Sequence, residues 1–126
     1  MAWTVDARLT VVIVGDAAGL AAALAAGPKA AVLAEAPPPP MPDGAAALAS
    51  FDPSGPSHAG GCACCGGRSP AAAALDRLFQ ARVRGACPWF ERMVVLAETQ
   101  AAREEVAAAL AGDAVTAARF RLAPPP

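Results

Sequence analysis

Short apolar runs rich in β-branched residues alternate along this chain with segments rich in alanine and leucine. Residues 9–14 form a nearly continuous run of this kind, which is typical of a strand buried on both faces of a parallel sheet. After a Gly-Asp turn, residues 19–26 have the composition of a helix, which a Gly-Pro pair ends. Residues 30–34 are a second, shorter strand candidate. We therefore predict a βαβ unit over residues 9–35.

Residues 36–61 interrupt this alternation. Proline, glycine, serine and alanine dominate the segment, and residues 37–40 are four consecutive prolines. Such a composition favours loops, and residues 45–49 could form one helical turn at most. We therefore predict a flexible excursion loop over residues 36–61.

A clear helix signal follows the loop. Ser69 suits the N-cap position and Pro70 the first helical position. The helix is predicted to run to Arg84, because Gly85 is a typical terminator. Four apolar side chains with a spacing of three or four residues lie on one face of this helix: Leu75, Leu78, Phe79 and Val83.

The rest of the chain predicts a strand at 91–97, a helix at 101–111 and a last strand at 115–122. Cys87 is expected to pack near the start of the first of these strands, and the neighbouring Trp89 and Phe90 to pack in the core or at a hinge.

The pattern as a whole predicts one domain over residues 1–126. In it, residues 62–122 comprise a cysteine motif followed by helix, strand, helix and strand. The alternation of strands and helices implies a three-layer α/β fold around a small, mainly parallel sheet.

Charge and hydropathy exclude two classes of partner. Ten Lys and Arg residues against eleven Asp and Glu residues give a formal net charge of −1, without the basic stripe that nucleic-acid binding requires. The most apolar stretch, residues 9–26, is interrupted by Asp16 and by glycines, so it does not predict a membrane span. A signal peptide needs a basic region before its apolar stretch, but Asp6 and Arg8 offset each other there. We expect a cytoplasmic protein that binds neither nucleic acid nor membrane.

The strongest chemical signal is a cluster of cysteines. Cys62, Cys64 and Cys65 are flanked by glycines, so the backbone can curl around a small ligand, and His58 lies four residues upstream. Soft thiolates favour Zn²⁺, with Co²⁺, Ni²⁺ or Cu(I) as competitors. The cluster is a candidate metal site, in which His58, water or a partner supplies a further ligand. The alternatives without a metal are that His58 is a solvated loop histidine and that the cysteine cluster is a vestigial motif that binds no specific ion.

Residues 61–68, Gly-Cys-Ala-Cys-Cys-Gly-Gly-Arg, resemble the Gly-Cys-x-Cys-Cys motif of the CobW-type metallochaperone GTPases, which an arginine and a helix follow. Residues 88–92, the strand after them and the segment Ala-Glu-Thr-Gln at 97–100 are similar to that family in order and spacing. The similarity covers about residues 60–122. It implies a P-loop-type α/β domain and a Zn²⁺ or Co²⁺ site with three thiolates. Arg68 would then offset the thiolate charge, or it is a surface residue.

The turn after the first strand departs from that family. The family has a phosphate-binding loop, Gly-x-x-x-x-Gly-Lys-Ser/Thr, whereas residues 15–22 contain neither the lysine nor the hydroxyl. Asp16 also places a negative charge where phosphates would lie. The resemblance therefore implies an incomplete P-loop domain that does not hydrolyse GTP. In it, Thr99 serves as the N-cap of the next helix or lies near a nucleotide.

The same turn permits a rival interpretation. Residues 11–20, with Glu35 at the end of the second strand, are similar to the strand-turn-helix of flavin- or NAD-binding domains, in which Gly15 and Gly19 would approach the cofactor and Glu35 a ribose hydroxyl. The middle glycine of that motif is absent, so a tight strand-helix connection without a ligand is the alternative.

These observations leave three hypotheses. The first is a non-catalytic, CobW-like metal-binding protein that acts in metal handling or homeostasis. The second is a degenerate domain that binds GTP, FAD or NAD. The third is an accessory interaction module that forms a homodimer or pairs with a full-length relative of the family.

Overall fold

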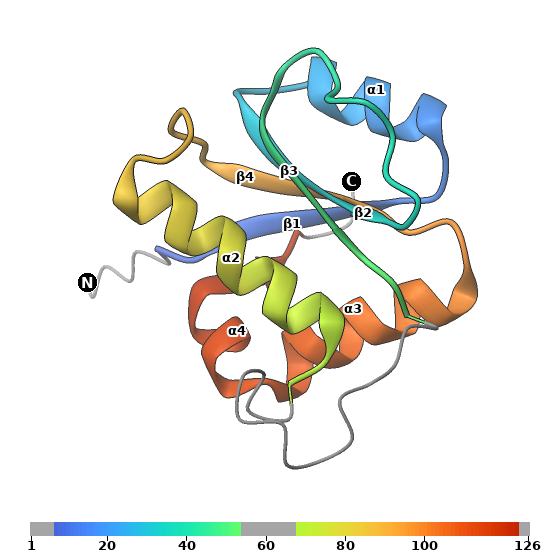
Figure 1. The fold of residues 1–126 in the computed structure, drawn as a ribbon, viewed down its shortest axis with the longest axis vertical. Helices are drawn as coiled ribbons and strands as arrows, with labels where there is room; N and C mark the ends of the chain where they lie inside the picture. Colours follow the sequence, from blue (N-terminus) through green and yellow to red (C-terminus); the bar gives the residue numbers. More distant parts are fainter. Residues whose placement is uncertain (1–6, 54–67, 124–126) are drawn as a thin grey trace, which may run out of the picture.

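One five-stranded sheet organises the chain (Figure 1). The computed structural model describes residues 7–53 and 68–123. The strand order is β3-β2-β4-β1-β5, and all neighbouring strands are parallel. The elements are, in chain order, β1 Leu9–Val14, α1 Ala17–Ala25, β2 Ala30–Glu35, β3 Ala45–Phe51, α2 Pro70–Arg84, β4 Arg92–Leu96, α3 Gln100–Gly112, α4 Ala114–Arg119 and β5 Phe120–Leu122.

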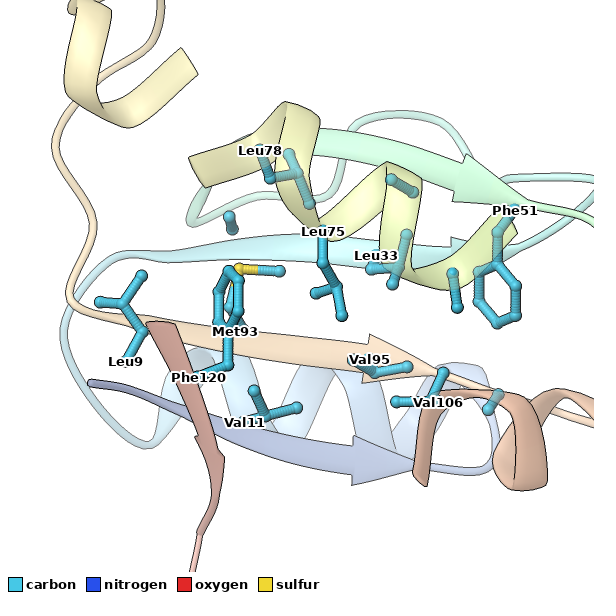
Figure 2. Packing of buried hydrophobic residues seen from close by; sticks show 14 of the residues in the cluster. Leu9, Val11, Leu33, Phe51, Leu75, Leu78, Met93, Val95, Val106 and Phe120 are labelled. Atoms are coloured by element: carbon cyan, nitrogen blue, oxygen red, sulfur yellow. The ribbon is translucent and has the colours of Figure 1, made fainter. Parts of the chain in front are cut away.

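Helices cover both faces of the sheet. On one face, α2 and α3 bury the larger core, and Figure 2 shows Leu75 of α2 pointing toward the strands and Val106 of α3 lying beside Val95 of β4. On the opposite face, α1 buries a smaller cluster through Leu20 and Leu24. This arrangement confirms the predicted three-layer α/β fold with a parallel sheet. Within the described ranges, no helix has the length and apolar character needed to cross a membrane.

Side chains fix the ends of the helices, as the sequence predicts for α2. The Ser69 hydroxyl accepts a hydrogen bond from the Ala72 amide at 3.2 Å, and Gly85 ends the helix in the left-handed region with φ of 70°. Thr99 is the N-cap of α3, which confirms that prediction also.

The C-terminal end of α1 depends on an arginine from another strand. Arg92, the first residue of β4, donates hydrogen bonds to the carbonyls of Ala23, Leu24 and Pro28 at 2.7, 3.2 and 2.8 Å. A Cβ at Gly27 would lie 3.2 Å from Nε of Arg92, a tight contact that the absence of a side chain at Gly27 avoids.

The interpretation of residues 36–61 as a loop was wrong for Ala45–Phe51. These residues form β3 and pair with β2 over its whole length. Alanine is a poor strand former, so the composition gives no local signal. Pairing with β2 and cover by α2 stabilise the strand instead, and both depend on tertiary contacts.

The strand predicted at 115–122 was also largely wrong. Residues 114–119 form α4, and only Phe120–Leu122 pairs with β1. The Asp113 side chain caps α4 by accepting a hydrogen bond from the Thr116 amide at 2.9 Å. This local contact selects a short helix over an extended chain.

The segment before β4 packs largely as expected. Cys87 packs against the larger core, and Phe90 is fully buried. Trp89, in contrast, is 59% exposed, and the Arg82 guanidinium lies 3.5 Å from the centre of its ring. Trp89 therefore contributes a surface cation–π pair rather than core packing.

Leu75→Ala is expected to lower the free energy of unfolding by about 2–5 kcal/mol, because Leu75 is fully buried beneath α2 and a cavity would remain. Val83→Ala on the same helix is the control. Val83 is 61% exposed, so the loss there should stay within about 0.5 kcal/mol. Denaturant unfolding measures both, and equal losses would contradict this packing of α2.

Candidate functional site

The carboxyl ends of β2, β4 and β1 lie side by side, because these strands are neighbours and run in the same direction. After β1 the chain enters α1 on one face of the sheet, and after β4 it enters α3 on the other face. Parallel α/β proteins bind their ligands at crevices between strands whose connections diverge in this way. This edge is therefore the candidate site. Five polar or glycine positions of the sequence analysis meet there: Gly15, Asp16, Glu35, Glu98 and Thr99.

Glu35 ties β2 to the turn after β4. Its Oε1 accepts hydrogen bonds from the amides of Glu98 and Thr99 at 2.8 and 2.9 Å, and its Oε2 accepts one from the Thr99 hydroxyl at 2.7 Å. Burial alone would raise the pKa of Glu35, but these hydrogen bonds and the charge of Arg103 outweigh it and hold that pKa below its ordinary value. The carboxylate is therefore ionised and engaged at neutral pH.

Arg103 is a residue of this edge that the sequence analysis missed. Its Nη1 donates a hydrogen bond to the Ala97 carbonyl at 3.0 Å, and the same nitrogen lies 4.0 Å from the position that a Cβ of Gly15 would occupy. Arg103 thus brings a positive charge between the ends of β4 and β1. An arginine in the first turn of a helix opposes the helix dipole, and that unusual position was the available signal.

Asp16 closes the turn after β1. Its Oδ1 accepts a hydrogen bond from the Gly19 amide at 2.7 Å and caps α1. A Cβ at Gly19 would lie 3.2 Å both from this oxygen and from Cβ of Val14. The close packing of the turn therefore favours glycine at position 19. The predicted role of Gly15, Gly19 and Glu35 in cofactor binding stays a prediction.

The predicted metal ligands Cys62, Cys64, Cys65 and His58 lie outside the described residues. Within 7–53 and 68–123, no three His, Cys, Asp or Glu side chains group in a way that could hold a metal ion. Cys87 is a free thiol that precedes β4, so it lies at the amino end of the sheet, opposite the candidate edge.

Arg68, which follows the cysteine motif, is anchored on the protein. It forms a fork with Asp113, from Nε to Oδ2 at 2.9 Å and from Nη2 to Oδ1 at 3.1 Å. It also donates to the Thr116 hydroxyl at 3.3 Å. The hydrogen bond from Arg68 lowers the pKa of Asp113 to about 2, although burial opposes the shift. The first described residue after the motif is thus fixed to the start of α4.

A second carboxylate fixes the same end of α2. Glu105 of α3 accepts a hydrogen bond from the Ala71 amide through Oε2 at 2.9 Å. Beside this contact lies a shallow hollow of about 430 Å³. Its polar lining residues are Arg68, Ser69, Glu105 and Asp113. The charged groups of this lining already have partners within the protein, so it is a structural junction of α2, α3 and α4.

Comparisons of the chain with known protein families, with curated proteins and with solved structures found no significant match. The resemblance to the CobW-type proteins accordingly depends on the motif at residues 61–68 and on the order of the segments that follow it.

Glu35→Gln is expected to lower the free energy of unfolding by about 1–3 kcal/mol, because the amide loses the charge-assisted bonds and turns an N–H toward the Thr99 hydroxyl. Glu98→Gln, at an exposed neighbouring position, should change it by less than about 0.5 kcal/mol. Because the folded pKa of Glu35 is depressed, its contribution is present above pH 4.5 and is lost as the pH falls through the folded pKa. The difference in free energy of unfolding between wild type and Glu35→Gln should therefore become smaller at acid pH.

Asp113→Asn should remove a pH-dependent part of the stability. The folded pKa of Asp113 is about 2, below the ordinary value of 3.8. At a pH above 3.8, ionised Asp113 therefore adds about 2 kcal/mol to the free energy of unfolding, and this contribution is lost as the pH falls toward 2. The pH dependence of the free energy of unfolding, measured with urea between about pH 5 and pH 2, tests this contribution. Asp43→Asn, which removes an exposed carboxylate, is the control. A wild-type pH slope in Asp113→Asn would contradict the role of the fork.

Proposed function

We propose that this chain is a non-catalytic, CobW-like metal-binding protein that acts in metal handling or homeostasis. The observation that supports this most is the sequence Gly-Cys-Ala-Cys-Cys with an arginine and a helix at the matching spacing. Cys62, Cys64 and Cys65 would bind Zn²⁺ or a similar ion as thiolates. His58 is the candidate fourth ligand, and an open fourth position would suit a carrier that transfers its ion to a recipient.

The position of the motif in the chain supports the proposal. The motif connects the carboxyl end of β3 to the first turn of α2. Ligand sites of parallel α/β proteins gather at the carboxyl ends of the strands. Both anchor points are held: the Ala36 amide donates to the Phe51 carbonyl at 2.8 Å, and Arg68 is fixed to Asp113. A site between two fixed ends costs less chain entropy to order around an ion.

The carboxyl edge favours metal binding over the alternative nucleotide function. The Asp16 carboxylate already accepts the Gly19 amide at the start of α1, where a phosphate would need free donors and a nearby lysine. Glu35 is likewise engaged with the turn after β4. We therefore propose a P-loop-like domain in which phosphoryl transfer is lost.

Reduced, metal-free protein is expected to bind one equivalent of Co²⁺ with thiolate-to-metal charge-transfer bands, and Zn²⁺ should displace the Co²⁺. Competition with a chromophoric chelator under anaerobic conditions measures the affinity. Cys64→Ala should weaken binding by about two orders of magnitude and change the bands, because one thiolate ligand is lost.

Cys87→Ala is the matched control, since Cys87 is a described thiol before β4, at the amino end of the sheet, and its loss should leave the affinity unchanged. Far-UV circular dichroism of each variant establishes that the fold is retained. Wild-type affinity in Cys64→Ala would refute the proposal. Saturable binding of GTP, FAD or NAD together with absent metal binding would favour the alternative.

A further inference from the structure

The strand β3 has an outer edge that pairs with no other strand of the described chain. It lies at the end of the strand order and forms hydrogen bonds with β2 on its inner side only. An edge strand presents a row of backbone amides and carbonyls that can pair with another chain. Proteins usually protect such edges, so the character of this edge is informative.

The direction of each peptide group in β3 follows from one hydrogen bond. The Phe51 carbonyl accepts the Ala36 amide, which continues β2, so the peptide groups of Phe51 point inward. Successive residues of a strand alternate in this direction, with amide and carbonyl of one residue on the same side. The amides and carbonyls of Leu48 and Ser50 therefore point outward, away from β2.

This edge has few of the usual protections. Ala45–Phe51 contains no charged residue and no proline. A register shift between Ala30 and Ala31 places a bulge at Ala46, which leaves residues 47–51 as a regular unpaired edge. The opposite edge of the sheet, β5, is three residues long and has Arg121 at its centre. The edge at β3 is thus the more suitable of the two for pairing.

We propose that β3 pairs with β3 of a second copy of this chain, antiparallel, with a two-fold axis at Ala49. In this register Leu48 lies opposite Ser50 of the other copy, and Ser50 opposite its Leu48. Residues that point outward on both strands then exchange both hydrogen bonds, as the closely spaced pairs of an antiparallel ladder require. The two sheets of five strands become one continuous sheet.

The side chains fit a two-fold pair of identical strands. In the same register Ala49 lies opposite Ala49, and Ala47 opposite Phe51. No two bulky side chains therefore face each other directly. No like charges meet, because the strand has none. A symmetric pair is also closed: it uses the β3 edge of the described sheet in both copies and does not continue into a fibre. These features favour a second copy over an open-ended partner.

The test is the dissociation constant of the dimer, measured by sedimentation equilibrium over a wide concentration range. The protein is kept reduced and free of metal with a chelator, so that disulfides and bridging ions through the cysteine motif cannot link two copies. Wild type should form dimers. Ser50→Pro should raise the dissociation constant about ten-fold or more, because each copy loses an outward amide. Proline is tolerated at an edge strand where the N–H faces outward, so pairing with β2 should survive.

Ser50→Ala is the matched control, since it keeps the amide and should dimerise like wild type. Amide hydrogen exchange adds a second measurement. The amides of Leu48 and Ser50 should become protected as the concentration rises, whereas those of exposed α1 residues should not change. Monomeric wild-type protein, open-ended oligomers or equal dimerisation of Ser50→Pro would each overturn the proposal. None of these outcomes depends on the metal affinity.

Discussion

All strands of the described sheet run in the same direction, and the rest of the structure follows from this constraint. Parallel neighbours cannot be joined by tight turns, so each connection must cross a face of the sheet. The crossings bring α1 to one face and α2 and α3 to the other, and the strands are buried between them. The same constraint collects the polar turns at one edge and leaves β3 as an unpaired margin.

At the carboxyl edge, the protein satisfies its own polar groups. Glu35, Asp16 and Thr99 each accept hydrogen bonds from turn or helix amides that would otherwise lack partners. An edge that is satisfied internally is rigid and has few donors left for an anion. The described polar side chains of this edge thus hold the strand turns and helix starts in place.

The parts of this fold that could be predicted are those with strong local signals. The β-branched run at Leu9–Val14 and the Ser-Pro start of α2 required no tertiary information. β3 could not be predicted, because a strand of alanines is stabilised by β2 and α2 alone. The bond between Glu35 and Thr99 joins residues 64 positions apart, and spacing along a chain does not show such contacts. Arg68 was identified, but its partner Asp113 was not, for the same reason.

The placement of β4 has a consequence for the order in which the chain can fold during synthesis. β1 and β2 are not neighbours; β4, the fourth strand in the sequence, lies between them. Arg92 at its start also satisfies the last carbonyls of α1. In a nascent chain that ends before residue 92, β1 therefore has no neighbour to join it to β2, and the last carbonyls of α1 lack the hydrogen bonds from Arg92. The sheet can therefore be completed only after β4 has been synthesised. Because its contacts join residues distant in sequence, folding is expected to be slow compared with a helical domain of this length.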